Sequence, residues 1–499
     1  MCWSFKQLLH CGRPLSNFKL TATIKTKVKR TTNNAMSKLC LKDYDAYGFD
    51  LDHTLAKYNL VNQIQLTYNS LIDFLVHQRG YDPELRTDVG LHKDFICKGL
   101  FVDTEKGNII KLSHSGKILR GSHGMRMLTQ EELVSAYGPN LIWEHYEHAR
   151  EAVRARAGNQ EFVFWENNFN VPGILVAAQV IDYLDKKNGG PLLSYRDILW
   201  KDLQEAVEEI YRFQAFGENS GYFFPVIKES TSKYYQSSSE GVKQWLLDLK
   251  QNNKCVFLTT SSHIDFASLT ASATLGEDWK SYFDIIVSNA RKPGFFQDHK
   301  PFLSLDGFNE HEVVDYNSLQ QHGVYSSGNH SDLEKFISKL TGADKPKVVY
   351  FGDSLCSDAF PVKTLTNWDL ILVLEEMEAE GYHPHDNTHH YWEPEERDRK
   401  IVRKVNLCVD EEEEAYLLSR QWGSFFYHPE ADPLHDRHMN TFWGELITKY
   451  SDIAIPSMEY IAGLPLDHQF TRFDHSVDGS TDGFSPAKPK PLLPLVLSD

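Results

Sequence analysis

Residues 47–55 of the 499-residue chain read Tyr-Gly-Phe-Asp-Leu-Asp-His-Thr-Leu, and they are the most informative part of the sequence. Its apolar start resembles a buried strand, and a strand places the residues that follow it at one edge of a sheet. There, Asp50 suits a nucleophile beside a divalent cation and a phosphate, while Asp52 suits proton transfer. An Asp-x-Asp pair before a helix is also a common capping device, so the motif alone leaves both interpretations open.

Further apolar segments that end in polar residues continue the pattern downstream. A helix is expected at Gly241–Leu249. Several buried strands separated by helices predict an α/β fold with a doubly wound parallel sheet, whose ligands bind at the carboxyl ends of the strands. The expected strands are Lys254–Ser262, Phe283–Ser288, Lys347–Asp353 and Trp368–Glu375.

Three of these strand ends supply candidate site residues. Thr260 suits a phosphate oxygen or a helix cap, and Lys292 suits phosphate neutralisation or an ordinary surface position. Asp353 and Asp358 suit a magnesium site, although Gly-Asp-Ser is also a common turn. Because all of these residues follow strands in the expected order, the functional interpretation is favoured over a set of unrelated coincidences.

These motifs resemble those of the haloacid dehalogenase superfamily: Asp-x-Asp-x-Thr, a strand-terminal Thr, a Lys and Gly-Asp-x-x-x-x-Asp. More narrowly, residues 48–55, Ala290–Phe296 and Asp103–Lys111 are similar to the cytosolic purine 5'-nucleotidase family. The resemblance runs from about Tyr44 to Phe473 and implies a Rossmann-like haloacid dehalogenase core. Three further stretches point to one branch of that family: Tyr350–Ser354, Trp422–Phe426 and Ala454–Ser457.

The resemblance implies a mechanism with Mg²⁺ as cofactor. Asp50 would attack phosphorus to form an aspartyl-phosphate, and Asp52 would exchange the protons. Thr260 and Lys292 would hold the phosphate oxygens. The metal would be bound by Asp50, Asp52 (through its carbonyl) and Asp353, with Asp358 nearby. An acid at position 52 separates phosphatases of this kind from dehalogenases, whose leaving group needs no proton.

Roughly 190 residues separate the first two motifs, which is too long for one sheet crossover and predicts a large inserted cap domain. In the resembling nucleotidases, such a cap covers the cleft and selects the base. The resemblance therefore assigns substrate-binding roles to several residues of the cap and of the core motifs. These residues are Phe169, Asn170, Glu208 and Tyr211 in the cap, and Thr54 and Ser261 in the core.

Three positions in the cap depart from the family pattern, as does one in the core. Gln204, Glu208 and Tyr211 stand where the purine enzymes carry Arg, Asp and a base-stacking His. Losing the Arg fork removes a directional contact, which places purine specificity in doubt. Ser261 replaces the usual Asn of the second motif, and its hydroxyl still suits a phosphate.

Composition defines the two ends of the chain. Residues 1–42 carry nine Lys or Arg and no acid, which fits a transit segment or a disordered extension. Residues 475–499 are rich in Pro and predict a disordered tail. Between them we expect the core at 43–60 and 241–375, the cap at 61–240 and an acidic appendage on the core at 376–474. We expect its acidic stretches, which begin at Glu375–Glu380, to be solvated or to dock a basic partner.

The resulting hypothesis is a magnesium-dependent phosphomonoesterase, a 5'-nucleotidase that hydrolyses nucleoside 5'-monophosphates. Two alternatives stay open: a non-catalytic regulatory or scaffold protein on the same fold, and a phosphatase for another phosphomonoester. The formal net charge of −17 argues against nucleic acid as a partner, and no apolar stretch predicts a membrane span. A homo-oligomer is compatible with the sequence. The expected location is cytoplasmic, or mitochondrial if residues 1–42 act as a transit peptide.

Overall fold

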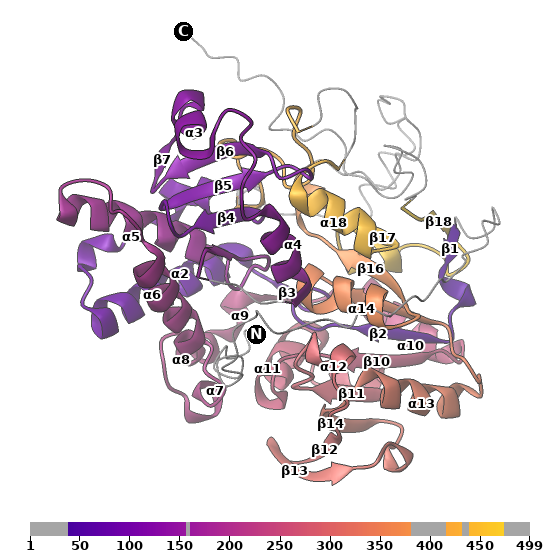
Figure 1. Ribbon diagram of the computed structural model, residues 1–499. Helices are drawn as coiled ribbons and strands as arrows, with labels where there is room; N and C mark the ends of the chain where they lie inside the picture. Colours follow the sequence, from indigo (N-terminus) through magenta and orange to yellow (C-terminus); the bar gives the residue numbers. More distant parts are fainter. Residues whose placement is uncertain (1–37, 156–159, 381–415, 432–438, 474–499) are drawn as a thin grey trace, which may run out of the picture.

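The computed structural model describes residues 38–155, 160–380, 416–431 and 439–473. A nine-stranded sheet forms its centre, and helices and a second sheet pack around it (Figure 1). In sheet order, the strands are β13 (Asn309–Val314), β12 (Phe302–Asp306), β14 (Gly323–Ser327), β11 (Ile285–Ser288), β10 (Cys255–Thr259), β2 (Ala46–Phe49), β15 (Val348–Gly352), β16 (Asp369–Val373) and β17 (Ile453–Ile455). The fold is therefore α/β, as predicted.

Seven adjacent strands of this sheet, from β14 to β17, run parallel, whereas β12 and β13 pair antiparallel. The chain adds strands on one side of β2 and then crosses to the other side to form β15. Because parallel crossovers are right-handed, helices on the two sides of this switch cover opposite faces. The helices are α10 (Glu240–Gln251), α11 (Ile264–Leu275), α12 (Gly294–Gln297), α13 (His330–Thr341), α14 (Phe360–Leu365), α18 (Phe442–Tyr450) and α19 (Met458–Ala462).

The central strand β2 is buried along its whole length, which explains its apolar sequence. Gly48 is required there because a side chain at this position would collide with two rings. Its Cβ would lie 2.2 Å from the ring of Phe257 on β10 and 2.7 Å from Tyr350 on β15. The neighbouring aromatics therefore close over β2 and fix the strand that leads to Asp50.

Residues 59–234 form one continuous insertion, here called the inserted segment. It leaves and re-enters the core through the antiparallel pair β3 (Lys57–Tyr58) and β9 (Tyr235–Gln236). Its five-stranded sheet has the order β7 (Arg126–Met127), β6 (Ile118–His123), β5 (Asn108–Leu112), β4 (Leu100–Asp103) and β8 (Phe162–Phe164). Its helices are α2 (Leu60–Arg79), α3 (Gln130–Tyr137), α4 (Tyr146–Ala155), α5 (Pro172–Asn188), α6 (Arg196–Ile210), α7 (Ala215–Glu218), α8 (Phe224–Glu229) and α9 (Thr231–Tyr234).

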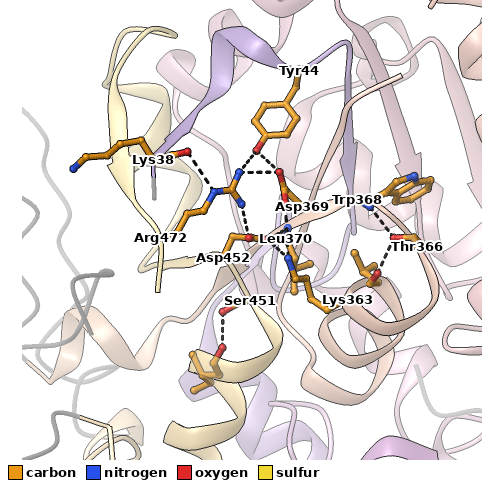
Figure 2. A network of polar contacts seen from close by, with 12 residues as sticks. Lys38, Tyr44, Lys363, Thr366, Trp368, Asp369, Leu370, Ser451, Asp452 and Arg472 are labelled. Atoms are coloured by element: carbon orange, nitrogen blue, oxygen red, sulfur yellow. Dashed lines mark hydrogen bonds and ion pairs between the residues drawn. The ribbon is translucent and has the colours of Figure 1, made fainter. Parts of the chain in front are cut away.

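The beginning and the end of the described chain are joined by β1 (Lys38–Cys40) and β18 (Gln469–Thr471), which pair antiparallel. Figure 2 shows the polar contacts beside this pair. Arg472 donates to Asp369 Oδ2 at 2.9 Å and to the Tyr44 hydroxyl at 3.1 Å, and it also pairs with Asp452. Asp452 in turn accepts from the backbone amide of Leu370 at 2.8 Å. This network joins the central sheet to the first and last segments of the described chain.

The stretch expected as an acidic appendage differs from the prediction in two ways. It contributes β17 to the central sheet, beside β16. The expectation of a solvated acidic face is wrong for Glu376 and Glu380, which are buried. Glu376 pairs with Lys98 at 2.7 Å, and Glu380 accepts from the amide of Phe425 at 2.6 Å, so partners far away in sequence offset the cost of burial.

Several sequence expectations lie outside the described residues. These are nearly all of the basic extension (1–37), the Pro-rich tail (475–499) and the acidic stretches within 381–415. Among the helices that the structure describes, none combines the length and the apolar character needed to cross a bilayer.

Candidate active site

Asp50 directly follows β2 and lies at the carboxyl edge of the central sheet. Its backbone amide donates to Phe351 on β15 at 2.8 Å, and its carboxylate accepts from the amide of Leu51 at the same distance. Lys292 reaches this carboxylate from the loop after β11, with 2.9 Å between Nζ and Oδ1. Because β11, β10, β2 and β15 are consecutive in the sheet, the candidate residues that follow them meet at one edge.

The loop after β15 brings two further carboxylates to Asp50. Ligand oxygens of Asp50, Asp353 and Asp358 all lie within 4.8 Å of one another. Asp358 also binds Lys292, at 2.6 Å from Nζ. Gly352 makes this approach possible because a Cβ at that position would lie 2.6 Å from the Asp358 carboxyl carbon. The structure thus brings together four residues that follow three different strands in the sequence.

The charges of this cluster fit a bound divalent cation. Three carboxylates around one ammonium group leave a formal charge of −2 in a largely buried place. Burial raises the pKa of Asp50 to about 7; Lys292 lowers it, and Asp358 and Asp52 raise it further. Burial, followed by Asp50 and Asp358, raises the pKa of Asp353 well above its usual value. Carboxylate oxygens are preferred ligands of Mg²⁺, so the donor set suits that ion.

Two hydroxyl groups, one on β3 and one in the loop after β10, hold the carboxylate of Asp52. Tyr58 on β3 donates to Oδ1 at 2.6 Å, and Ser262 donates to Oδ2 at 2.5 Å. Burial, and then the nearby Asp52, raise the pKa of Tyr58 well above its usual value, so this hydroxyl keeps its proton. Both contacts orient the carboxylate, which suits a group that exchanges protons.

The second motif forms a tight loop after β10. The hydroxyl of Thr260 accepts from the amide of Ser262 at 3.0 Å, and the hydroxyl of Ser261 accepts from the amide of Lys292 at the same distance. Thr260 is fully buried at the end of its strand. The loop therefore links the end of β10 to Lys292 and, through Ser262, to Asp52.

Thr54, the remaining residue of the first motif, lines a cavity and is not part of the acid cluster. It shares this small cavity of about 20 Å³ with His53 and Glu375, and among the described residues its buried hydroxyl has no hydrogen-bond partner. The neighbouring His53 ring stacks on Tyr58 at 4.6 Å and contacts the Phe169 ring at 4.9 Å. Phe169 of the inserted segment is thus packed on the loop that carries Asp52.

The other predicted base-binding residues take part in contacts within the inserted segment. Tyr211 is buried, and its hydroxyl donates to the backbone carbonyl of Phe169 at 2.8 Å. Glu208 accepts from Gln204 at 3.1 Å on α6, and Asn170 is buried at the start of α5. Binding of a base by these residues stays a prediction.

Sequence reasoning missed several residues that contact the site. Tyr58 and Ser262 donate to Asp52, Glu166 binds the loop after β15, and Lys98 pairs with Glu376 and acts electrostatically on Asp353. Burial alone would lower the pKa of Lys98, but Glu376 and then Asp353 raise it overall. Only Ser262 carried a sequence signal, because it belongs to the run of hydroxyl residues at the end of β10; the others come from segments without a motif.

The motif Asp103–Lys111 has a structural place in the inserted segment. Asp103 accepts from the Tyr137 hydroxyl at 3.1 Å and from the Trp143 indole at 3.4 Å. Lys111 is buried and donates to three successive carbonyls, of Trp422, Gly423 and Ser424. Two stretches that carried the family resemblance therefore contact each other.

Comparison with known proteins agrees with this geometry. The model of the 5' nucleotidase family matches residues 34–452. 5'-Nucleotidase domain-containing protein 1 from Homo sapiens is 41% identical over 450 residues, which cover 89% of this chain and 95% of the human protein. The protein of the same name from Bos taurus is 40% identical over 460 residues, 91% of this chain and 96% of the bovine protein.

A more distant relative is 5'-nucleotidase domain-containing protein 2 from Homo sapiens, 26% identical over 378 residues, which cover 74% of this chain and 69% of that protein. The resemblance inferred from the motifs is confirmed, including the branch to which the stretches at 350–354, 422–426 and 454–457 point. The chain therefore belongs to the 5'-nucleotidase family, hydrolases that act on phosphoric monoesters.

Proposed function

We propose that this chain is a magnesium-dependent phosphatase of nucleoside 5'-monophosphates. Its core would be of the haloacid dehalogenase type, with the inserted segment as its cap. The observation that carries the proposal is the convergence of Asp50, Asp353 and Asp358 around Lys292 at the edge of the parallel sheet. The same convergence favours an enzyme over a non-catalytic scaffold, because burying several carboxylates together is costly and carboxyl groups with raised pKa values cluster at functional sites.

In this proposal Asp50 attacks the phosphorus atom and forms an aspartyl-phosphate. Its carboxylate is already oriented by the Leu51 amide and by Lys292. Bound Mg²⁺, held by Asp50, Asp353, Asp358 and the Asp52 carbonyl, would offset the repulsion between carboxylate and phosphate.

Asp52 would give a proton to the leaving ribose oxygen and then take one from the water that cleaves the intermediate. The hydroxyls of Tyr58 and Ser262 hold its two oxygens throughout, so the carboxyl group stays aimed at one position. Lys292 and the loop that starts at Thr260 would stabilise the negative oxygens of the phosphate. Lys292 keeps the positive charge that this role requires, because Asp358 and Asp50 outweigh the effect of burial and raise its pKa well above the usual value.

Base selection is assigned to the inserted segment around Phe169 and Asn170, with Glu208 and Tyr211 behind them. Phe169 contacts the ring of His53, so this segment already lies on the loop of the first motif. Because Gln204 stands in place of a family Arg, we expect weaker discrimination between bases than in the purine enzymes.

We also propose a cytoplasmic location, which a fluorescent tag on the full chain tests directly; mitochondrial signal would contradict it.

The decisive experiment is phosphate release from a panel of nucleoside monophosphates and other phosphomonoesters with Mg²⁺. Wild type should turn over at least one nucleotide, and Asp50→Asn should reduce the rate to background. Asp306→Asn, at an exposed position on β12, is the matched control and should retain full activity. Turnover that is equal in wild type and Asp50→Asn would contradict the proposed nucleophile, and turnover of non-nucleotide esters alone would contradict the substrate class.

A further inference from the structure

Glu166 connects the inserted segment to the loop that carries Asp353 and Asp358. It lies between β8 and α5, and its Oε1 accepts from the Ser354 hydroxyl at 2.5 Å. Both carboxylate oxygens also lie within hydrogen-bond distance of the Cys356 amide, at 3.1 and 3.2 Å. One side chain therefore binds two donors of a loop 188 residues further along the chain.

Ser354 also organises the loop that Glu166 binds. After β15, Ser354 caps a short π-helical turn, Leu355–Ala359, and accepts from the amide of Ser357 at 2.9 Å. The amide of Ser354 lies 3.3 Å from Asp358 Oδ2. Because Ser354 follows Asp353 and touches Asp358, a shift of Ser354 moves both candidate metal ligands.

The contact places a further carboxylate near a cluster that already carries excess negative charge. Placing a carboxylate near other negative charges costs free energy, which hydrogen bonds to the carboxylate offset. Glu166 accepts such bonds from the Ser354 hydroxyl and the Cys356 amide. The Cys356 amide belongs to the first turn of the π-helical segment, and first-turn amides lack an acceptor within their own helix. Glu166 thus supplies an acceptor at the start of this turn.

The same part of the inserted segment also touches the other side of the site. Asn168 donates to Glu375 Oε2 at 3.4 Å and lies 3.5 Å from His53 Nδ1. Phe169 packs on His53, as described above. Residues 166–169 therefore contact the loop of the first motif and the loop of the last motif at once.

We propose that Glu166 is a positioning residue that holds Asp353 and Asp358 in the geometry for metal binding. It thereby couples metal affinity to the placement of the segment that carries Phe169. This inference rests on the proposed function, because it presumes that the acid cluster binds a divalent cation. Residues that orient metal ligands through hydrogen bonds typically contribute about 10–100-fold to metal affinity.

The test measures metal binding directly, without catalysis. Mn²⁺, a paramagnetic substitute for Mg²⁺, is titrated into the full chain and the free ion is followed by electron paramagnetic resonance. Glu166→Ala should bind Mn²⁺ about tenfold more weakly than wild type. Glu166→Gln keeps an oxygen that accepts from Ser354 and Cys356, so its affinity should stay within about threefold of wild type. Glu131→Ala, at an exposed position on α3, is the matched control and should bind as wild type.

A second measurement separates positioning from a general loss of structure. Ser354→Ala removes the Ser354–Glu166 hydrogen bond from the other side, together with the contact to the Ser357 amide, so the effects of the two single variants on Mn²⁺ affinity should be less than additive in Glu166→Ala/Ser354→Ala. In steady-state assays, Glu166→Ala should raise the Mg²⁺ concentration for half-maximal rate about tenfold, while saturating Mg²⁺ should restore most of kcat. If Glu166→Ala does not fold, Ser354→Ala takes its place in both measurements.

The outcomes distinguish this inference from the proposed function. Equal Mn²⁺ affinity in wild type and Glu166→Ala overturns the positioning role and leaves the phosphatase proposal intact. Full additivity of the two single variants also overturns it. A wild-type protein that binds no Mn²⁺ overturns the metal site itself, and the positioning role with it.

Discussion

Ser262 Oγ lies 2.5 Å from Asp52 Oδ2 and donates a hydrogen bond to it. The contact joins the ends of two neighbouring strands, β2 and β10, and fixes one oxygen of the proposed proton carrier. A hydrogen bond to a charged group contributes about 1.5–3 kcal/mol, which corresponds to at least about tenfold in rate if the geometry of Asp52 matters in the transition state.

We therefore expect Ser262→Ala to lower kcat for phosphate release about tenfold or more, with a smaller change in KM. Tyr58→Phe should have a similar effect, because it frees the other oxygen of Asp52. The measurement is a steady-state assay with saturating Mg²⁺. Ser268→Ala on α11 is the control, since its hydroxyl returns to the carbonyl of Ile264 within the same helix, and it should leave kcat unchanged. An unchanged kcat in both Ser262→Ala and Tyr58→Phe would show that Asp52 is not held by these contacts.

Gly352→Ala should disturb the acid cluster, because the added methyl group would collide with Asp358. The new Cβ would lie 2.6 Å from Asp358 Oδ2, closer than real Cβ contacts, so Asp358 or the backbone of residue 352 must shift, which disturbs the Asp358 contact to Lys292. Overpacking of this kind costs about 1–3 kcal/mol of stability, and we expect it to reduce the phosphatase rate more than about tenfold. Gly241→Ala is the control, because its nearest neighbour is 3.7 Å away. Chemical denaturation and the Mg²⁺-dependent assay measure the two effects, and a fully active Gly352→Ala protein would contradict the close packing.

Lys111→Met should destabilise the whole protein. The methionine side chain fills similar space but leaves the carbonyls of Trp422, Gly423 and Ser424 without their buried donor. Since each unsatisfied buried group costs about 1–3 kcal/mol, we expect the free energy of unfolding to fall by at least about 2 kcal/mol. Lys335→Met, at a half-exposed position, should change it by less than about 0.5 kcal/mol. Guanidinium chloride unfolding of both variants tests this, and similar midpoints for the two would refute it.

Glu380 should make stability depend on pH. Burial raises its pKa to about 7, whereas the unfolded chain releases this proton near 4.5; the Ser424 hydroxyl and the Phe425 amide oppose the shift. Stability from this group is therefore complete below about pH 4.5 and is lost as the pH rises towards 7. The nearby charge of Lys111 also lowers the pKa of Glu380, and burial lowers the pKa of Lys111 itself to about 8.

Glu380→Gln removes this titration. We expect the free energy of unfolding of the variant, relative to wild type, to grow by about 1–3 kcal/mol between about pH 5 and pH 7.5. Denaturant unfolding at several pH values measures the difference. A difference that does not change with pH would mean that Glu380 is ionised in the folded protein throughout this range.

The parallel sheet could be predicted from the sequence because its strands are short apolar runs that end in chemically distinctive residues. Residues Asp50, Lys292, Asp353 and Asp358 meet for a geometric reason that needs no alignment: the carboxyl ends of neighbouring parallel strands share one edge. The convergence of these four side chains is therefore confirmed, whereas their roles as nucleophile and ligands stay predictions.

The contacts that support the site could not be predicted in this way. Glu166 and Ser354 lie 188 residues apart, and neither belongs to a periodic pattern. The acidic run that contains Glu376 and Glu380 looks solvated in sequence, because the partners that allow its burial, Lys98 and Ser424, come from other parts of the chain. The antiparallel strands β12 and β13 at the sheet edge were also missed, since their partly exposed residues give no buried-strand signal.

The network around Arg472 also constrains how the protein is made. Tyr44, two residues before β2, binds Asp369 and Arg472. During synthesis Tyr44 leaves the ribosome 428 residues before Arg472, so this tyrosine next to β2 is made long before its cationic partner. A nascent chain that stops short of Arg472 leaves Asp369 and Asp452 without this cation, so the network beside the central sheet stays incomplete until the last described residues are made.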